Sequence, residues 1–374
     1  MIPRQYKKNW RRNVAAVGKT LAKIVLFSCA VALPSAAWAA DTLAPKPTIV
    51  TLLAGVTGAD VQKALDLLPV TGGEVLLPAG IIRVQKPIIL QRDRETLCGS
   101  GAGTILYLAD NANCPVVILG QPVNHPRQTI KDLELSDLFI DGNRAHQQRE
   151  LWQFQGEGSE IRNNGITVQD VWDSAIEHVT SARCRSGGLV TTLGVRHLTV
   201  RDFTSFDNQF DGLACYLTMD SLFTKLSLHN NPGAGISLDL AFDHNVIANA
   251  VLAANDLGIF MRSSRNNQFR DIAIHNSHHY GVFMAQWWMK TAQGPEPAPQ
   301  TRCTDNSFTD LIASQCGRAA FRINDIGCTN NVIIGAQFTG DLAGLSLVRP
   351  NLLGDQVEAS PARQTTVRVA STTD

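Results

Sequence analysis

A glycine recurs at nearly constant intervals through the middle of the chain, and the residues that follow it recur as well. The steps are 23, 24, 23, 23 and 23 residues, between Gly165, Gly188, Gly212, Gly235, Gly258 and Gly281. Each glycine opens an alternation of apolar and polar residues, as in Gly235–Asp239, which is typical of a strand with one buried face. Two further strand signals follow in each interval, for example Asn245–Ile247 and Ile272–Ile274. Three short strands per repeat predict one coil of a parallel β-helix.

The repeated residues also indicate how each coil turns. The glycines are expected where a positive φ angle or a close backbone approach excludes a side chain. Asparagines are expected to mark the bends, at Asn208, Asn231, Asn255 and Asn276. Leucine-rich repeats have a similar period, but their leucine consensus is absent. The expected fold is all-β, a single-stranded right-handed parallel β-helix with coils of about 23 residues.

Residues 1–39 are predicted to be a secretory signal peptide. They hold seven basic and no acidic residues, an apolar run over Ile24–Leu33, and the small-x-small motif Ala37–Ala39. The run is short for a membrane span, and an uncleaved anchor is the alternative. The whole chain has 33 basic and 33 acidic residues, so cleavage leaves an excess of seven acidic residues. We therefore expect no nucleic-acid partner and no stable membrane insertion after cleavage.

The rest of the chain is expected to form one domain over residues 40–350, because a solenoid needs no second core. Apolar residues at helical spacing follow Thr57 and Asp60, which resemble a capping box, and they are Val61, Ala64, Leu65 and Leu68. They predict a capping helix within an N-terminal cap at 57–80, before coils over 81–347. Residues 351–374 are polar and aperiodic, and we expect a flexible tail.

Two glycine-rich motifs follow the predicted helix. Gly72–Gly80 reads GGEVLLPAG, and Gly99–Thr104 reads GSGAGT. Together with the helix they resemble the start of pectate-lyase-like right-handed β-helix proteins, and the resemblance extends from about Thr57 to Leu347. It implies the fold. The resemblance says little about activity, because that superfamily includes lyases, hydrolases, epimerases, binding proteins and phage tail parts.

The candidate site is a column of outward side chains. The fourth residue after each glycine points away from the core, which places Tyr216, Asp239 and Arg262 on successive coils about 4.8 Å apart. Such side chains suit a polymer that carries hydroxyls and carboxylates. Asp211 lies behind the column and is expected to bind substrate together with Gln286, Trp287 and Trp288. Beside it, a 16-residue interruption of the repeat follows Gln286 and begins with two tryptophans that suit sugar rings, Trp287 and Trp288.

The column has the groups that β-elimination at a uronate needs. Arg262 is expected to neutralise the carboxylate, and Tyr216 to act as base or acid if nearby positive charge lowers its pKa. Asp239 is expected to hold Arg262, bind a cation or share the proton transfer, with His279 as a reserve base. Hydrolysis would instead require Asp239 with another carboxylate, Asp211 or Asp256. The alternative is a surface ion pair between Asp239 and Arg262.

We therefore favour a secreted or periplasmic enzyme that acts on an acidic, uronate-containing polysaccharide as a lyase. A uronate epimerase or a glycoside hydrolase is the alternative, and a non-catalytic binding or surface-structural β-helix is the rival from another class. Named catalytic signatures of the superfamily are missing. No cofactor is indicated, and a calcium requirement stays open.

Seven cysteines remain after the predicted signal peptide, which contains Cys29. Cys303 and Cys328 stand in equivalent turns of successive coils, and the coil spacing lies within the Cα range of a disulfide. An oxidising compartment would permit that bond. Cys215 is expected to point inward as a small apolar residue. The pairing of the others stays open, namely Cys98, Cys114, Cys184 and Cys316.

Overall fold

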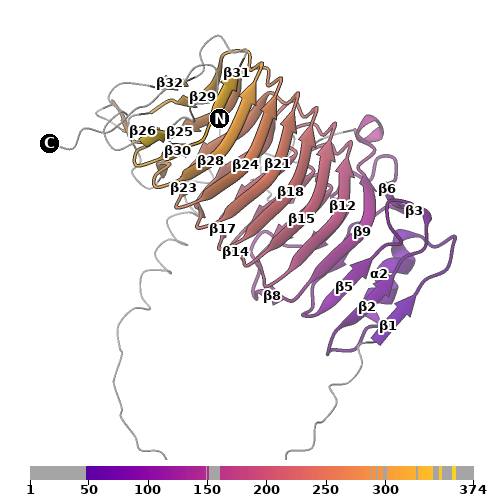
Figure 1. The fold of residues 1–374 in the computed structure, drawn as a ribbon. Helices are drawn as coiled ribbons and strands as arrows, with labels where there is room; N and C mark the ends of the chain where they lie inside the picture. The colour runs from indigo at the N-terminus through magenta and orange to yellow at the C-terminus, as the bar shows by residue number, and fades with distance from the viewer. Residues whose placement is uncertain are drawn as a thin grey trace, which may run out of the picture.

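The computed structural model confirms the predicted parallel β-helix, and it describes residues 48–148, 150, 161–286, 288–291, 294–297, 301–325, 327–339, 345–347 and 356–358. Strands follow one another around an elongated coil, and each pairs in parallel with its equivalent in the next coil (Figure 1). Three stacked sheets result, which we call sheets A, B and C. The predicted signal peptide lies outside the described residues.

Sheet A has the longest strands, and its described members are β1 (Thr48–Thr51), β2 (Gly73–Leu76), β3 (Gly80–Val84), β5 (Glu95–Cys98), β6 (Thr104–Leu108), β9 (Glu134–Asp141), β12 (Ala175–Ala182), β15 (Thr199–Phe206), β18 (Leu222–His229), β21 (Val246–Ala253), β24 (Gln268–His275), β28 (Ser307–Ser314), β30 (Val332–Ile334), β31 (Gln337–Thr339) and β33 (Gln356–Glu358). Sheet B begins at the repeated glycines and comprises β4 (Ile88–Leu90), β7 (Val117–Leu119), β10 (Ile166–Gln169), β13 (Leu189–Thr192), β16 (Leu213–Tyr216), β19 (Ala234–Asp239), β22 (Leu257–Arg262), β25 (Tyr280–Ala285), β29 (Ala319–Ile323) and β32 (Leu345–Leu347). Sheet C is built of two-residue strands, β8 (Ile130–Lys131), β11 (Val171–Trp172), β14 (Val195–Arg196), β17 (Thr218–Met219), β20 (Phe242–Asp243) and β23 (Ser264–Arg265).

The repeated glycines are required by close packing between coils. A β-carbon at Gly188 would lie 1.9 Å from Oγ of Ser205 and 2.7 Å from the carbonyl oxygen of Gly212 in the next coil. None of the six repeated glycines has a positive φ angle. Of the two reasons that the sequence left open, close approach is therefore the one that applies.

The predicted asparagine bends are partly wrong, because most of these asparagines lie in the interior. The N–H of Asn208 donates to Oδ1 of Asn231 (3.2 Å), and the N–H of Asn231 donates to Oδ1 of Asn255 (3.0 Å). All three are buried, and the positive φ angles fall on the residue before each, at Asp207, Asn230 and Ala254. Only Asn276 has the left-handed conformation itself, with φ of 54°.

A second asparagine ladder runs through the turn before sheet A. Each backbone N–H donates to Oδ1 of the asparagine in the next coil, at 2.9 Å from Asn245 to Asn267, 3.1 Å from Asn267 to Asn306 and 3.2 Å from Asn306 to Asn331. Their side-chain amides donate back to carbonyls of the preceding coil, as Asn267 does to Phe242 (2.9 Å). The ladder thus satisfies buried polar groups that the turn would otherwise leave unpaired.

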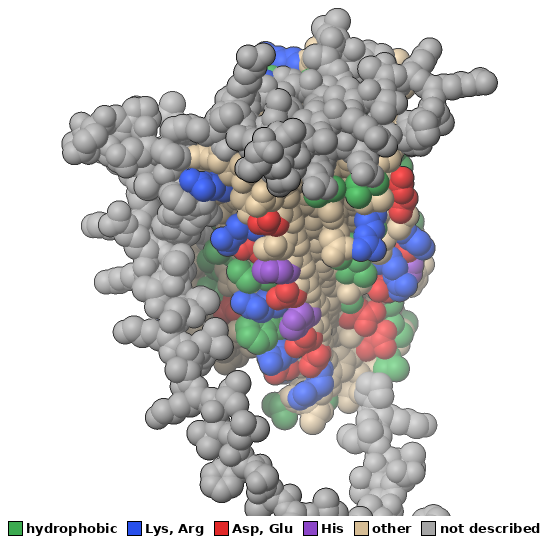
Figure 2. Space-filling model, turned by 60° about the vertical axis from the view of Figure 1, so that its left-hand side comes forward, with side chains coloured by type: hydrophobic (Ala, Val, Ile, Leu, Met, Phe, Trp, Pro, Cys, Tyr) green, Lys and Arg blue, Asp and Glu red, His purple; other side chains and the backbone are tan. Residues whose placement is uncertain are grey.

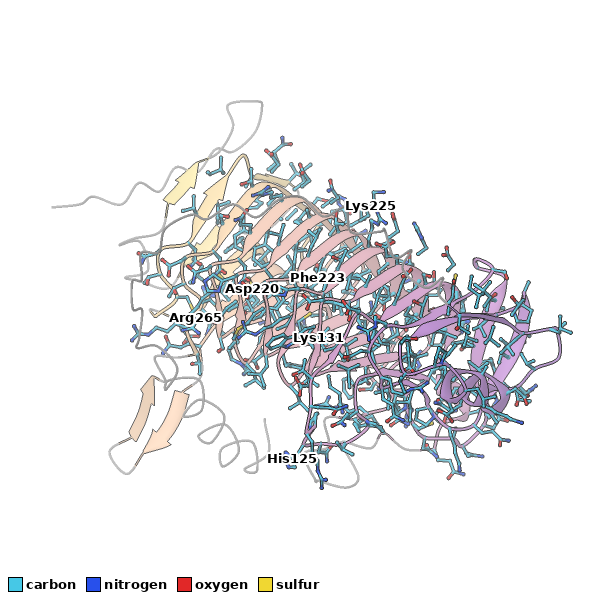
Figure 3. All side chains as sticks on the ribbon, turned by 90° about the horizontal axis from the view of Figure 1, so that it is seen from below. His125, Lys131, Asp220, Phe223, Lys225 and Arg265 are labelled. Carbon is cyan, nitrogen blue, oxygen red and sulfur yellow. The ribbon has the colours of Figure 1, made fainter. Side chains whose placement is uncertain are left out.

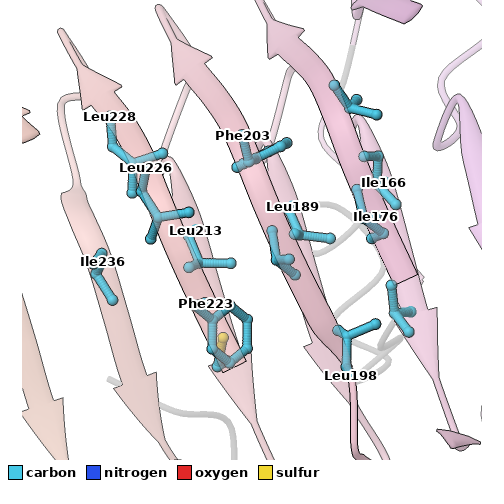
Figure 4. Packing of buried hydrophobic residues seen from close by; sticks show 14 of the residues in the cluster. Ile166, Ile176, Leu189, Leu198, Phe203, Leu213, Phe223, Leu226, Leu228 and Ile236 are labelled. Atoms are coloured by element: carbon cyan, nitrogen blue, oxygen red, sulfur yellow. The ribbon is translucent and has the colours of Figure 1, made fainter. Parts of the chain in front are cut away.

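One continuous apolar core fills the coil. The first residue after each repeated glycine points inward and is fully buried, namely Ile166, Leu189, Leu213, Ile236, Ile259 and Val282. Figure 4 shows the first four facing side chains of sheet A such as Phe203, Phe223 and Leu226. Cys215 is also fully buried in this core, as expected. Truncating one of these leucines to Ala is expected to cost about 3 kcal/mol.

The predicted helix is confirmed as α2 (Gly58–Asp66). Thr57 is its N-cap, and Thr57 and Asp60 form a complete capping box. The helix buries Val61 and Leu65 next to β2, β3 and β4 of the first coil. Its role as a cap stays a prediction. No helix among the described residues is long and apolar enough to cross a membrane.

The coil resumes after the second interruption as predicted, because β29 pairs with β25. Within the interruption, β26 (Trp288–Thr291) and β27 (Gly294–Pro297) form an antiparallel hairpin. The flexible tail predicted for residues 351–374 stays a prediction, and three of its residues are described as a strand. Gln356–Glu358 forms β33 on the edge of β30, whose backbone would otherwise lack a neighbour on that side.

Charged side chains on sheets A and C are interleaved between coils, as the face in Figure 2 shows. On sheet A, His178 lies 3.5 Å from both Asp137 and Asp202. On sheet C, the ring of Trp172 has Lys131 on one side and Arg196 on the other, with the cationic centres 5.1 and 5.7 Å from the ring centre. Figure 3 labels Lys131 and Arg265, which belong to the first and last described strands of sheet C. These charges therefore have partners within the protein.

Candidate functional site on sheet B

The predicted column exists, but it is not exposed throughout. Tyr216 ends β16 and pairs with Asp239 of β19, and Arg262 ends β22 in the next coil. Asp239 is only 2% exposed, and its Oδ2 accepts hydrogen bonds from Nε (2.9 Å) and Nη2 of Arg262. The expectation of an exposed aspartate is therefore wrong, because outward-facing strand residues can still be covered. Arg262 keeps a side-chain exposure of 20%.

Tyr216 does not have the lowered pKa that a base would need. Burial raises its pKa, and the negative charges of Asp211 and Asp239 raise it further, against smaller opposing effects of Arg162 and a hydrogen bond with Ser237. The phenol therefore stays protonated near neutral pH. The prediction of a base role for Tyr216 is corrected, and its protonated hydroxyl suits a proton donor.

Asp211, unlike Tyr216, has a pKa that suits a general base. Burial raises the pKa of its carboxyl to about 6, although the backbone N–H of Ala234 donates to Oδ1 at 2.7 Å and Arg162 lies nearby. A carboxylate that titrates near neutral pH suits a general base. Asp211 precedes β16 and Tyr216 ends it, and the two groups are close enough to interact electrostatically, with Arg162 near both.

His279 lies away from the column. Its Nδ1 contacts Oδ1 of Asp256 at 2.6 Å, at the start of β25. Arg262 pairs instead with Ala285 at the end of the same strand, six residues later. Six residues of strand span roughly 20 Å, so His279 cannot reach a group that Arg262 holds. The role of His279 as a reserve base stays a prediction that does not involve Arg262, and Asp256 is not a carboxylate partner for Asp239.

The residues predicted to flank the column have different positions. Gln286 is buried, and its N–H donates to Oδ2 of Asp325 at 3.0 Å. Trp287 lies outside the described residues, and Trp288 begins β26, of whose side chains the structure describes none. A sugar-stacking role for the two tryptophans stays a prediction.

Aromatic residues on the same face were missed by the sequence reasoning. Phe260 and Phe283 stack at 6.1 Å between ring centres, and Tyr280 lies 5.1 Å from Phe283. The guanidinium of Arg262 lies 5.3 Å from the ring centre of Phe260. Phe260 and Phe283 occupy the second position after their glycines, which also points outward. That position was a usable signal, and it extends the site toward the C-terminal coils.

Cys303 and Cys328 come together as predicted, but as free thiols. Burial and the neighbouring Cys328 raise the pKa of Cys303, and its thiol contacts the carbonyl oxygen of Ala285 at 3.6 Å. The remaining described cysteines are also free, namely Cys98, Cys114, Cys184, Cys215 and Cys316. The disulfide stays a prediction.

The stacked sheets and the outward polar column define a parallel β-helix protein of the pectate-lyase-like superfamily. More than half of the chain, residues 93–293, matches the family described as periplasmic copper-binding protein (NosD), and the chain belongs to that family. It is also 28% identical over 188 residues to mannuronan C5-epimerase AlgE1 of Azotobacter vinelandii, which covers 48% of this chain but only 13% of that relative.

Solved structures share the fold at low sequence identity. ORF18 of Geobacillus virus E2 has a TM-score of 0.62 and 12% identity, over 81% of this chain and 58% of that one. Polygalacturonase from Erwinia carotovora has a TM-score of 0.58 and 12% identity, over 88% of this chain and 99% of that one. At these identities the likeness supports the fold alone.

Copper is implied by the family description, and the described residues do not fit it. Copper sites in proteins use Cys, Met and His ligands. All nine histidines and seven of the eight cysteines are described, yet no three His, Cys, Asp or Glu side chains among the described residues come together as metal ligands would. We therefore derive no step through copper.

Proposed function

We propose that this protein modifies an acidic polysaccharide by removing the proton at C5 of a uronate residue. The observation that carries the proposal is the arrangement of Asp211 and Tyr216 on sheet B, with the guanidinium of Arg162 near both. Burial gives Asp211 a pKa of about 6 and keeps Tyr216 protonated, so one residue is ready to accept a proton and the other to donate one. The two aromatic rings farther along, Phe260 and Phe283, suit sugar rings.

In this reaction each of these residues has one role. Arg162, which lies near both Asp211 and Tyr216, pairs with the carboxylate of the reacting unit and makes the C5 proton more acidic. Arg262, oriented by Asp239, binds the carboxylate of a unit farther along the polymer. Asp211 takes that proton, and the C5–H electrons form a double bond between C4 and C5. The C4–O bond breaks, and the leaving oxygen takes the Tyr216 proton. This sequence is a lyase reaction, and a mildly raised base pKa matches it to neutral pH.

An epimerase is the second candidate, and the sequence likeness to mannuronan C5-epimerase AlgE1 favours it. It shares the carboxylate pairing and the proton abstraction. The proton then returns to C5 from the opposite face, and the glycosidic bond stays intact. Hydrolysis is disfavoured, because it needs two available carboxylates, and Asp239 is buried in its ion pair with Arg262.

The test is to incubate the purified protein with polymannuronate, polyguluronate and polygalacturonate in D2O. A lyase produces unsaturated ends with new ultraviolet absorbance, an epimerase incorporates deuterium at C5 without chain cleavage, and a binder does neither. We expect Asp211→Asn to abolish the reaction. The matched control is Asp220→Asn, because Asp220 is an exposed turn residue that pairs with Arg196 on sheet C.

Two results would overturn the proposal. One is that the wild-type protein neither cleaves nor exchanges deuterium into any of the three polymers. The other is that Asp211→Asn reacts at the wild-type rate while it stays folded by circular dichroism.

We propose a periplasmic or secreted location, supported by the segment at residues 1–39 and by the description of the family as periplasmic. N-terminal sequencing of the protein from a periplasmic extract is expected to begin at Ala40. Recovery of the chain in the membrane fraction with residues 1–39 attached would contradict this proposal.

A further inference from the structure

The side-chain amide of Gln286 is buried and has no hydrogen-bonding partner among the described residues. It is only 4% exposed, and neither Nε2 nor Oε1 has a partner among the described residues. Leaving such a group unsatisfied costs stability, and a hydrophobic residue would avoid that cost. A polar partner from outside the protein would remove that cost.

Arg302 and Gly327 lie close to Gln286. Nε of Arg302 is also buried and unpaired among the described residues. A β-carbon at Gly327 would lie 1.9 Å from Oε1 of Gln286 and 3.0 Å from Nε of Arg302. Gly327 has no positive φ angle, so space is the reason for glycine here. We call Gln286, Arg302 and Gly327 the Gln286 cradle.

The cradle lies beside the candidate site. Gln286 directly follows Ala285, which pairs with Arg262 on the neighbouring coil. Neighbouring coils are about 4.8 Å apart, so a polymer held by Arg262 passes within one coil of Gln286. The hairpin of β26 and β27 leaves the coil between Gln286 and Arg302, so the cradle sits at its base.

We infer that the Gln286 cradle binds the uronate unit next to the one that Arg262 holds, which rests on the proposed function. The Nε–H of Arg302 suits a carboxylate oxygen of that unit. The amide of Gln286 can accept from a sugar hydroxyl and donate to a second oxygen. A carboxylate gives Arg302 a charge-assisted hydrogen bond that is stronger than one from the hydroxyl of a neutral sugar, so the cradle favours consecutive acidic units.

The inference is tested by calorimetric titration of the full-length protein with oligomannuronates and oligogalacturonates, as dimers and hexamers. Gln286→Leu is expected to fold at least as stably as the wild type and to bind the hexamers about tenfold more weakly. Arg302→Gln is expected to weaken hexamer binding similarly, and Gly327→Ala to do so because its β-carbon displaces the amide of Gln286. Dimer binding beside Arg262 should change little in any of them.

Gln169→Leu is the matched control. Gln169 is another buried glutamine on the face of sheet B, but its Nε2 donates to the carbonyl oxygens of Gln121 and Val123 (2.8 Å to Val123). This variant should lose stability and bind the hexamers like the wild type. The inference fails if Gln286→Leu and Arg302→Gln both bind hexamers like the wild type while Arg262→Lys weakens binding. If the wild type binds no acidic oligomer, the proposed function fails as well.

Discussion

Asp239 and Arg262 are joined across two coils by hydrogen bonds from Nε and Nη2 of the arginine to one carboxylate oxygen of the aspartate. The aspartate is almost fully buried and the arginine partly exposed. The pair therefore fixes the guanidinium from behind while leaving part of its surface accessible to solvent. A lysine at position 262 would keep the charge but lose the planar fork.

We expect Arg262→Lys to lower turnover about 100-fold, because the charge no longer lies where the substrate carboxylate needs it. The free energy of unfolding should fall by about 2 kcal/mol, since Asp239 loses part of its pairing. Arg265→Lys is the matched control. Arg265 pairs with Asp243 on sheet C in the same two-donor manner. It should lose comparable stability, and a wild-type rate for Arg262→Lys would contradict the assignment.

The pKa of Asp211 predicts how the rate depends on pH. As a base, Asp211 works only when deprotonated, so kcat/KM should rise as pH increases through about 6. A profile that is flat from pH 5 to 8 would contradict its role as the base. The rise of kcat/KM with pH should be measured on the polymer that proves to be the substrate.

The same shift has a consequence for stability with a defined sign. The folded-state pKa lies above the ordinary value of 3.8, so the folded protein holds this proton more tightly than the unfolded chain does. The contribution of Asp211 is full below about pH 4 and is lost as pH rises to about 6. The unfolding free energy of the wild type relative to Asp211→Asn should therefore fall across this window. A difference that rises with pH would contradict the assigned shift.

Cys303 and Cys328 are expected to form a disulfide in protein isolated from an oxidising compartment. The two thiols are already neighbours, so little rearrangement of the coil is needed. Non-reducing peptide mapping should recover the two peptides linked. Protein from a reducing cytosol serves as the control and should give free thiols. Two free thiols in exported protein would contradict the prediction.

The asparagine ladder before sheet A should contribute strongly to stability. Asn267→Ala removes the acceptor for the N–H of Asn245 and the donor to the carbonyl oxygen of Phe242, all of them buried. We expect a loss of about 3 kcal/mol in denaturant titration. Gln268→Ala, at an exposed neighbouring residue, should change stability little. Equal effects of the two substitutions would mean that the ladder is not a major source of stability.

The fold could be predicted because its cause is local and repeated. Alternation sets the inward face of each strand, and the constant step between glycines aligns Tyr216, Asp239 and Arg262 across coils. The burial of Asp239 could not be predicted in this way, since periodicity tells which face a residue occupies and not what covers that face. The pKa of Asp211 could not be predicted either, because it depends on how far the side chain is buried.

The Gln286 cradle shows a second limit. Gln286 and Arg302 are separated by an interruption of the repeat, and Gly327 comes from the following coil. No spacing rule connects residues across a segment whose path the repeat does not determine. The outward phenylalanines, in contrast, obeyed the rule, and reading the second position after each glycine would have found Phe260 and Phe283.

The asparagine ladder separates the length of the chain from the height of the stack. Its steps are 22 residues from Asn245 to Asn267 and 39 from Asn267 to Asn306, yet the ladder hydrogen bonds are nearly equal in length. New sequence can therefore be inserted at a corner without disturbing the layers above and below. Within the layers, only duplication or deletion of a complete turn preserves every contact. In a gene of this kind the loops can vary in length and sequence, whereas the stacked coils can be gained or lost only as complete turns.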